Sequence, residues 1–247
     1  MARRRFFVEQ VHSGSAEIAG ENAQHLTRVL RVEAGQTFEI TDNHRVWLAT
    51  VETAHKNLVR FRVTDEIDAG APLPEVTLFL ALIKFERFEW AVEKAVELGV
   101  TRIVPVNAAR SERGLSEGAQ KRVERWRRIA HEASEQSRRL SAPEIEAPMK
   151  MTEALKHSAA HRFWCDERPG APGLGSAFHP QADDSTALII GPEGGWTDLE
   201  RTQFEIAGWR GVSLGPLVLR AETAVCAALS VIAQGWLAAK PVQSNQA

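Results

Sequence analysis

The hydrophobic pattern of the chain changes near residue 70. Before that point, apolar and polar residues alternate in short runs between turn residues, which is typical of half-buried antiparallel strands. The runs that we expect to form strands are 4–9, 35–42, 45–54 and 58–66. One helix is expected among them, at 21–31, because Leu26, Val29 and Leu30 fall on one face. Several short strands and one helix predict a small β-barrel.

A segment without periodicity follows this β-rich part. Residues 68–75 read D-A-G-A-P-L-P-E and contain two prolines and a glycine. Such a composition is typical of a linker. We therefore place a domain boundary at 68–75 and expect one domain at 1–70 and a second at 75–240.

After the linker the pattern becomes that of an α/β protein. Residues 76–83 are a continuous apolar run, as in a strand that is covered on both faces. Apolar residues then recur at helical spacing over 85–98, Gly99 provides a helix stop, and 101–106 is a second strand. This order predicts a β-α-β unit with a right-handed crossover.

Three further segments extend this domain. Long and short helices are expected at 119–140 and 150–160, and a strand at 161–167 precedes a Gly/Pro-rich loop at 168–184. The final helix, 221–239, is apolar or small on nearly every side. A helix of this kind has to be buried, and we expect a second subunit to bury it.

Two short apolar runs, 188–190 and 212–214, each end in a Gly-Pro turn. Runs this short, bounded by Gly and Pro, are typical of buried strands in a parallel sheet. In open α/β sheets, ligands bind to the loops at the carboxyl ends of strands. The loops that begin at Gly191 and Gly215 therefore predict one ligand site.

Several common chemistries lack their motifs in this chain. The first glycine loop, G-P-E-G-G, is neither G-x-G-x-x-G nor G-x-x-x-x-G-K-[ST], so a Rossmann dinucleotide site and a P-loop are both unsupported. No G-x-S-x-G elbow or H-E-x-x-H occurs, and the eight histidines are scattered. Cys165 and Cys226 lack the spacing of metal ligands, and we expect reduced core thiols. No metal site is expected.

Charge is unevenly distributed along a chain whose net charge is only −2. Residues 101–140 contain 10 Lys and Arg against 5 Asp and Glu, and the N-terminal segment is also basic. Such an asymmetry suits a local phosphate-binding surface, and it equally suits solvated helix faces without a partner. The arginines of the 119–140 helix therefore remain open to both interpretations.

The chain carries no feature that predicts export or membrane insertion. No run approaches about 18 consecutive apolar residues, so no transmembrane helix is expected. The basic N-terminus lacks the apolar core of a signal peptide. We expect a cytoplasmic protein.

Beyond these patterns, the sequence resembles the ribosomal RNA small subunit methyltransferase E family, which belongs to the SPOUT class of S-adenosylmethionine-dependent RNA methyltransferases. The resemblance covers nearly the whole chain. It includes R-R-F-F-V, H-L-T-R-V-L-R, K-F-E-R-F-E-W-A-V-E-K-A-V-E-L-G-V and E-Q-S-R-R-L-S-A-P-E-I. Its most specific motifs are G-P-E-G-G at 191–195 and L-G-P-L-V-L-R-A-E-T-A at 214–224. The chain departs from the family at Leu217, where an Arg is usual, and at Ala221, where a Thr is usual, so no essential role is expected for the side chain at 217.

The resemblance implies a fold and an activity. The N-terminal barrel would be PUA-like, and the second domain would be a SPOUT-type parallel sheet with a C-terminal deep trefoil knot. The enzyme would be a homodimer that transfers a methyl group from S-adenosyl-L-methionine to N3 of one uridine in 16S rRNA of the small ribosomal subunit, leaving S-adenosyl-L-homocysteine.

The resemblance also implies the residues of the site. Arg220 would stabilise the developing uracil anion, and Glu222 would orient Arg220 or help to move the proton. Glu222 could instead only stabilise the start of the last helix, and Glu193 could only shape its turn. The residues expected to bind the cofactor are Ile190, Gly191, Pro192, Glu193, Gly194, Gly195, Leu214, Gly215, Pro216, Leu219, Thr223 and Ala224. The residues expected to bind RNA are Arg3, Arg4, Arg5, Arg28 and Arg31.

Two other functions remain open on the sequence. One is a different SPOUT activity, on a ribose 2′-OH or another base. The other is a non-catalytic RNA-binding protein that uses the barrel. Cofactor binding and the identity of the methylated nucleoside would distinguish them.

Overall fold

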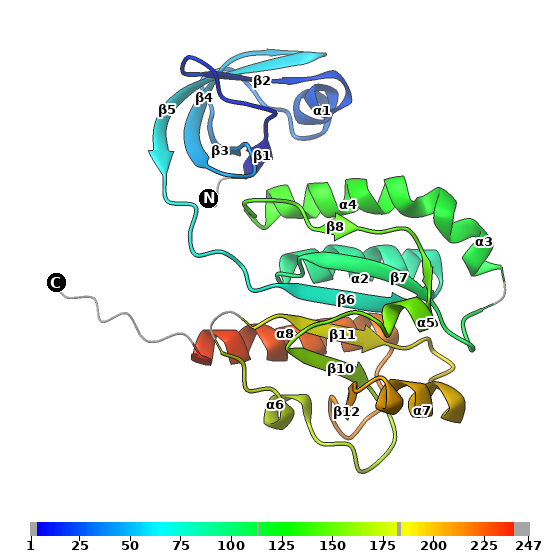
Figure 1. Cartoon of the computed structure of the whole chain (residues 1–247). Coiled ribbons are helices and arrows are strands. Elements are labelled where there is room, and N and C mark those ends of the chain that lie inside the picture. The colour runs from blue at the N-terminus through cyan, green and yellow to red at the C-terminus, as the bar shows by residue number, and fades with distance from the viewer. Residues whose placement is uncertain (1–3, 113, 182–183, 240–247) are drawn as a thin grey trace. The chain divides into compact units, whose positions relative to one another are not determined.

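The computed structural model describes residues 4–112, 114–181 and 184–239 (Figure 1). The chain divides into two compact units. The first comprises Met1–Pro72 and His131–Ala142, and the second comprises Leu73–Ala130 and Pro143–Ala247. The segment His131–Ala142 thus belongs to the first unit although about 60 residues of the second precede it in the chain.

The first unit is a five-stranded sheet curved around a small core (Figure 1). Its strands are β1 (Arg5–Phe7), β2 (Ser15–Ala19), β3 (Thr37–Thr41), β4 (Val46–His55) and β5 (Leu58–Ile67), in the order β1-β3-β4-β5-β2. Alternation predicted four of these strands, and β2 was not predicted. All neighbours are antiparallel except β1 and β3, which pair in parallel. Phe6, Ile40 and Phe61 are fully buried in the core.

The predicted helix of this unit consists of two consecutive helical segments of different type. α1 (Gly20–Gln24) continues directly into η1 (His25–Val29), a short π-helix. Leu26 points into the core, whereas Val29 is 64% exposed. The chain leaves this segment through Arg31, whose φ of +52° is uncommon for a residue with a side chain.

A buried ion pair joins separate parts of the first unit. Glu39 on β3 is 4% exposed and accepts a hydrogen bond of 3.1 Å from Arg5 Nε. Arg138 reaches the same carboxylate with two nitrogen atoms. Buried charges require such partners because removal from water is costly. Glu39 therefore ties β1 to the segment His131–Ala142.

The second unit is built on a parallel sheet. Its strands are β6 (Val76–Ala81), β7 (Arg102–Asn107), β8 (Glu144–Ile145), β9 (Met149–Lys150), β10 (His161–Cys165), β11 (Thr186–Ile190) and β12 (Arg210–Val212). The order is β12-β10-β11-β6-β7-β8, with β9 also on β7, and every neighbouring pair is parallel. β6 and β11 lie centrally, and every residue of both is buried. Continuous apolar runs therefore predicted the central strands correctly.

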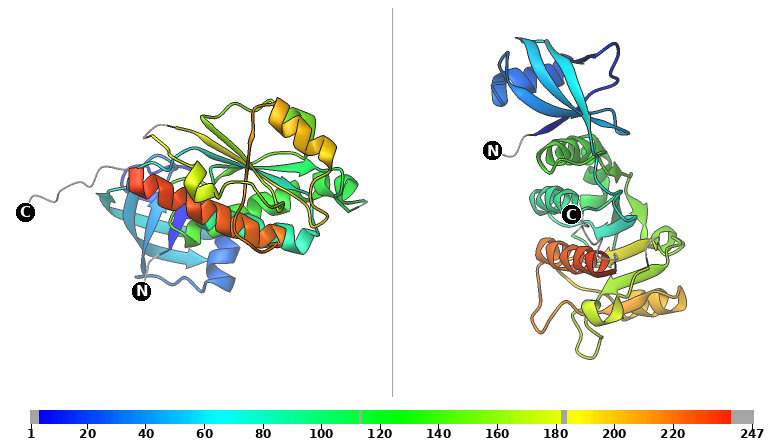
Figure 2. Two further views of the ribbon diagram at one scale, coloured as in Figure 1. Left: turned by 90° about the horizontal axis from the view of Figure 1, so that it is seen from below. Right: turned by 90° about the vertical axis from the view of Figure 1, so that its left-hand side faces the viewer.

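Helices cover both faces of this sheet. α2 (Phe85–Glu97) and α8 (Ala221–Ala239) lie on one face, and α5 (Met151–Ala154) and α7 (Asp198–Ile206) lie on the other (Figure 2). Phe88 of α2 packs against Trp126, with ring centroids 4.4 Å apart and the rings tilted by 35°. On the opposite face, Trp164, Trp196 and Phe204 form one apolar cluster. The remaining helices are α3 (Leu115–Ala119), η2 (Gln120–Arg122), α4 (Val123–Gln136) and α6 (Leu174–Ala177).

The structure corrects two of the predicted helices and confirms the bounds of the last one. The helix expected at 119–140 consists of η2 and α4 and ends at Gln136. The helix expected at 150–160 is only one turn, α5. α8 is 19 residues long and, by length and composition, apolar enough to cross a membrane, with 39% of its apolar window buried. Core helices pass the same test, and α8 packs against α2 and α6.

These elements confirm the expected fold class. A PUA-like half-barrel precedes a SPOUT-type parallel α/β sheet, in which the last helix returns from the edge strand β12 to the central part of the sheet. The loops after β11 and β12, which the sequence identified as candidate ligand loops, consequently belong to one unit and leave the same edge of one sheet.

Candidate active site

The loops that follow β10, β11 and β12 enclose one pocket of about 170 Å³ in the second unit. β11 supplies Ile190 and the loop to Trp196, and the end of β10 supplies Cys165, Asp166 and Glu167. The loop after β12 supplies Ser213, Leu214, Gly215, Leu217, Val218 and Leu219. Ala221 and Ala224 of α8 complete the lining. The pocket therefore lies where the carboxyl ends of three neighbouring strands meet.

Glycine is required in the first loop because side chains and backbone already occupy the adjacent space. A Cβ atom on Gly191 would lie 2.9 Å from the Trp196 ring. On Gly195, whose φ is +67°, it would lie 2.6 Å from Glu167 Oε1. On Gly194 it would lie 3.0 Å from Arg110 Cβ. The loop can approach the pocket this closely only without side chains.

The structure brings together most of the residues predicted to bind the cofactor. Those that line the pocket are Ile190, Gly191, Pro192, Glu193, Gly194, Gly195, Leu214, Gly215, Leu219 and Ala224. Pro216 and Thr223 are exposed and lie outside the lining, so a role for either stays a prediction. Leu217 and Val218 also line the pocket, although both are more than three-quarters exposed.

The two residues predicted to act in catalysis occupy different environments. Arg220 is exposed immediately before α8, whereas the Glu222 side chain in the first turn of α8 is 14% exposed. Glu222 Oε2 is buried without a hydrogen-bond partner. No hydrogen bond or ion pair joins Arg220 to Glu222 in the part of the chain that the structure describes, so the predicted orienting contact is not formed in this state.

Arg87 is a site residue that the sequence interpretation missed. It lies in the first turn of α2, and its Nη1 donates a hydrogen bond of 2.8 Å to Glu193 Oε1. Its Nε lies 3.8 Å from Glu222 Oε1. One guanidinium thus faces a carboxylate of the first loop and a carboxylate of α8. Its position after the apolar strand β6 was the available signal.

The acidic wall at the end of β10 was also missed. Arg201 of α7 is 8% exposed and holds both carboxylates, with Nη2 at 3.0 Å from Asp166 Oδ1 and 2.8 Å from Glu167 Oε1. Trp196 Nε1 donates to the Cys165 carbonyl oxygen at 2.8 Å. Burial, and secondarily the Asp166 charge, raises the pKa of the Cys165 thiol to about 12, so this thiol is neutral.

α7 is held in place at its N-terminus. The Thr197 hydroxyl accepts from Glu200 N, and the Glu200 carboxylate accepts from Thr197 N, which forms a capping box. Glu200 also accepts a hydrogen bond of 2.8 Å from Ala109 N after β7. This arrangement fixes the helix that carries Arg201.

The predicted RNA-binding arginines divide into three groups. Arg28 and Arg31 are exposed around η1, and Arg4 is half-buried. Arg5 is buried against Glu39, so its guanidinium is not available at the surface. Arg3 lies outside the described residues. Arg28 and Arg31 are therefore the arginines of the five that the surface presents most openly.

Three arginines of the 119–140 segment have partners within the second unit. Arg122 and Arg125 both bind Glu89 of α2, Arg125 with two hydrogen bonds of 2.7 and 2.8 Å. The Arg125 hydrogen bonds lower the pKa of Glu89, although burial by itself would raise it. Arg127 donates to the Ile145 carbonyl oxygen. These contacts favour the structural interpretation for this part of the positive charge.

The pocket lining has a distinctive charge. It contains the carboxylates Asp166, Glu167 and Glu193 and no lysine or arginine. Among the described residues, no group of three or more His, Cys, Asp and Glu could hold a metal ion. A site of this kind suits a ligand that carries positive charge and hydrogen-bond donors, and it disfavours phosphates.

Comparison with known proteins gives consistent matches over the whole chain. Residues 70–233 match the family described as RNA methyltransferase domain, and 18–64 match the RNA methyltransferase PUA domain. The protein named ribosomal RNA small subunit methyltransferase E from Synechocystis sp. is 34% identical over 91% of this chain and 74% of its own length. The protein of that name from Bacillus subtilis is 30% identical over 93% and 95%.

Two solved structures are similar throughout. That of a ribosomal RNA small subunit methyltransferase E from Neisseria gonorrhoeae bound to S-adenosyl methionine has a TM-score of 0.85 at 29% identity, covering 95% of this chain and 98% of that one. That of a methyltransferase from Legionella pneumophila with its bound cofactor has a TM-score of 0.82 at 30% identity, covering 94% and 97%.

Proposed function

Since the chain belongs to the RNA methyltransferase family, we propose that it is an S-adenosylmethionine-dependent enzyme that methylates N3 of a uridine in 16S rRNA of the small ribosomal subunit. The observation that carries this proposal is the pocket formed by the two glycine-rich loops, with its acidic lining. The functional division is a PUA-like RNA-binding domain at 1–70 and a methyltransferase domain at 75–240.

The residues present fit S-adenosylmethionine. Gly191 and Gly195 line the pocket without side chains, so a flat ring could lie close to the loop backbone. The cofactor has a sulfonium, an ammonium and ribose hydroxyl groups and no phosphate, which agrees with three carboxylates and no basic side chain in the lining. The residues that hold it are those of the two loops together with Ala224. When bound, the cofactor supplies a methyl group on positively charged sulfur.

Uridine N3 carries a proton and is a poor nucleophile until that proton leaves. The bound cofactor would supply the methyl group for N3, and the N3 proton would have to pass to a base of the protein. Arg220 is exposed and directly follows Leu219 of the second loop, and its role would be to stabilise the negative charge that spreads onto the uracil oxygens. Glu222 would accept the proton or orient Arg220 once the substrate is bound, and its buried Oε2 has no hydrogen-bond partner among the described residues.

RNA binding involves the first unit. N3 lies on the Watson–Crick edge, so the base has to be unpaired and turned out of its helix. Arg28 and Arg31 are exposed and would contact the phosphates that flank the target. The enzyme acts in the cytoplasm, where the small subunit is found.

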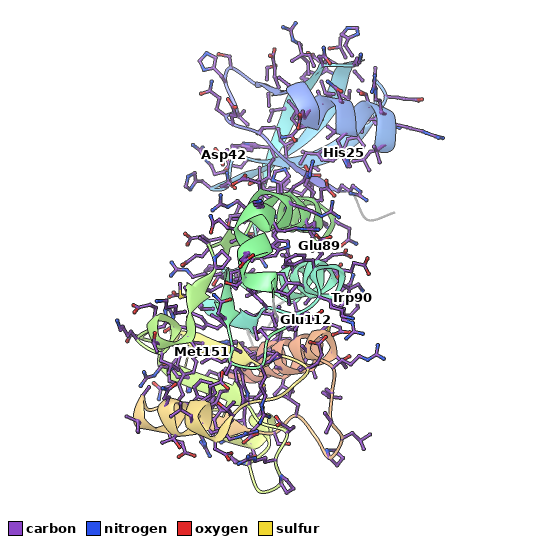
Figure 3. The ribbon with its side chains drawn as sticks, turned by 90° about the vertical axis from the view of Figure 1, so that its right-hand side faces the viewer. His25, Asp42, Glu89, Trp90, Glu112 and Met151 are labelled. Carbon is purple, nitrogen blue, oxygen red and sulfur yellow. The ribbon has the colours of Figure 1, made fainter. Side chains whose placement is uncertain are left out.

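The enzyme is a homodimer, and the apolar surface of α8 supports this. Only 39% of its apolar window is buried within one chain, and Leu237 is 63% exposed. Trp90 projects from the outer side of the neighbouring α2 and is 45% exposed (Figure 3). A second copy would remove these side chains from water. Light scattering after gel filtration should give twice the mass of one chain.

The test of the activity uses small-subunit particles that lack the modification. Wild-type protein with S-adenosylmethionine should yield 3-methyluridine on digestion and mass analysis of the nucleosides. Arg220→Ala should bind the cofactor with unchanged affinity in calorimetry and lose turnover. A ribose-methylated product would assign a different activity, absence of cofactor binding would favour a non-catalytic RNA-binding protein, and full turnover by Arg220→Ala would remove its catalytic role.

A further inference from the structure

The acidic wall of the pocket contains one carboxylate that is fixed in place and still able to accept hydrogen bonds. Glu167 follows β10, lines the pocket, and has a side chain that is 38% exposed. Its Oε1 accepts a hydrogen bond of 2.8 Å from Arg201 Nη2. Its Oε2 forms no hydrogen bond with any residue that the structure describes. One oxygen is thus an anchor and the other is free.

Arg201 is itself rigidly placed. Besides Glu167, it donates to Asp166 with Nε and Nη2, at 3.0 to 3.3 Å, and to the Trp196 carbonyl oxygen. Asp166 has a side chain that is only 10% exposed, and Arg201 engages both of its oxygens. Of the two carboxylates at the end of β10, Glu167 is therefore the one that remains available to a ligand.

The free oxygen of Glu167 lies beside the first glycine loop. The position of a Cβ atom on Gly195 is 3.6 Å from Oε2 and 2.6 Å from Oε1. A ligand that packs against the loop backbone at Gly195 therefore comes within reach of this carboxylate. In α/β sheets that bind nucleosides, an acidic residue after a strand accepts hydrogen bonds from ribose hydroxyl groups.

The charge around Glu167 favours a neutral donor over a cation. The Arg201 guanidinium lies 2.8 Å from one oxygen, so it already neutralises part of the carboxylate charge and would repel a second cation. Two vicinal hydroxyl groups supply donors without positive charge. The α-ammonium group of the cofactor would be less well accommodated at this position.

We propose that Glu167, held by Arg201, recognises the ribose diol of the cofactor, so that the pocket selects adenosine-type ligands through the end of β10. This inference rests on the proposed function, in which the pocket binds S-adenosylmethionine. Glu167 touches the cofactor, and Arg201 is a positioning residue that acts through Glu167.

Calorimetry with four ligands tests the assignment. The probes are S-adenosylmethionine, 5′-methylthioadenosine, which keeps the ribose and lacks the amino acid, and the 2′-deoxy and 3′-deoxy forms of 5′-methylthioadenosine. Glu167→Gln should raise the Kd of the first two by about 10- to 100-fold, the value expected for loss of a hydrogen bond to a charged group. For wild-type protein at least one deoxy ligand should bind more weakly by a similar factor, and Glu167→Gln should remove most of that difference.

Glu193→Gln is the matched control, since Glu193 lines the same pocket and is held by another arginine. It should keep the full difference between the ribose and deoxy ligands. Thermal unfolding without ligand checks that each variant is folded, and Arg201→Lys should weaken the diol preference without abolishing it.

The outcomes separate the inference from the proposed function. If Glu167→Gln weakens S-adenosylmethionine but leaves 5′-methylthioadenosine unchanged, the carboxylate contacts the methionine end and the ribose assignment is wrong. Unchanged binding of both ligands would remove Glu167 from the cofactor site. If wild-type protein binds neither ligand, the proposed function fails together with the inference.

Discussion

The substitution Gly195→Ala tests whether the first glycine loop needs its left-handed conformation for cofactor binding. Gly195 has a φ of +67°, and a Cβ atom would lie 2.6 Å from Glu167 Oε1. The added methyl group therefore strains the backbone and displaces the end of the Glu167 side chain. Both effects fall on the wall of the pocket.

The magnitude follows from these two contributions. A residue with a Cβ atom in the left-handed region costs about 1–2 kcal/mol. Movement of Glu167 away from Arg201 loses an ion pair of 2.8 Å with a partly exposed partner, which is worth about 0.5–1 kcal/mol. The free energy of unfolding should therefore fall by about 1.5–3 kcal/mol. We expect the Kd of S-adenosylmethionine to rise at least tenfold, which is about 1.4 kcal/mol.

Gly208→Ala is a matched control from the same unit. Gly208 has a φ of +78°, and a Cβ atom would lie 3.0 Å from Arg162 Nη2, again the end of a flexible charged side chain. It lies after α7 and does not line the pocket. The backbone cost is therefore similar, about 1–2 kcal/mol, while the cofactor affinity should be that of the wild type.

Urea unfolding followed by tryptophan fluorescence measures the free energy of unfolding, since six of the seven tryptophans belong to the second unit. Unfolding with ligand at 100 times the wild-type Kd measures the affinity for the cofactor. The ligand should stabilise wild-type protein and Gly208→Ala by about 2.7 kcal/mol and Gly195→Ala by about 1.4 kcal/mol or less. Equal stabilisation of all three proteins would refute the argument that close approach at Gly195 matters for the site.

Three further predictions concern other parts of the molecule. Arg28→Ala should lower the salt dependence of RNA binding by about one counterion in filter-binding titrations, whereas Lys56→Ala in the exposed β4–β5 turn should leave the slope unchanged. Glu39→Gln should lower the free energy of unfolding of the first unit by about 3–5 kcal/mol, because the buried Arg5 charge loses its compensation, and a loss below about 1 kcal/mol would contradict this role. Burial, together with nearby arginines, lowers the pKa of His157 below its usual 6.5, so the unfolded chain binds the proton more tightly. Stability contributed by this group is complete above pH 6.5 and is lost as pH falls through the folded pKa. His157→Gln should therefore reduce the pH dependence of the urea unfolding midpoint in that range.

Much of the fold could be predicted from the sequence because its signal is local. Alternation over 45–54 and 58–66 predicted β4 and β5, and continuous apolar runs predicted β6 and β11. Glycine and proline after two of these runs identified the loops of the pocket, since a strand end and a turn are encoded in adjacent residues. β2 was missed because its five residues follow directly from a turn and lead directly into α1.

The side chains around the pocket could be predicted only in part. The family resemblance implied ten of the lining residues, but it assigned no role to Arg87, Glu167 or Arg201. Arg87 meets a carboxylate 106 positions away, and Arg201 meets Asp166 35 positions away. Periodicity has no information on such pairs because it reports which face is apolar and not which charges meet.

The tertiary structure also decided which arginines are available. Charge patterns grouped Arg5 with Arg28, and they left the arginines of the 119–140 segment open to RNA or solvent. Burial beside Glu39 makes Arg5 a structural residue, and Glu89 engages Arg122 and Arg125. The sequence by itself determined the polar and apolar pattern of the strands, the glycine loops and the family resemblance. Each of these depends on residues that are close together in the chain. Only the tertiary structure decided which charges are paired, because a carboxylate and a guanidinium neutralise each other through distance in space, whatever their separation along the chain.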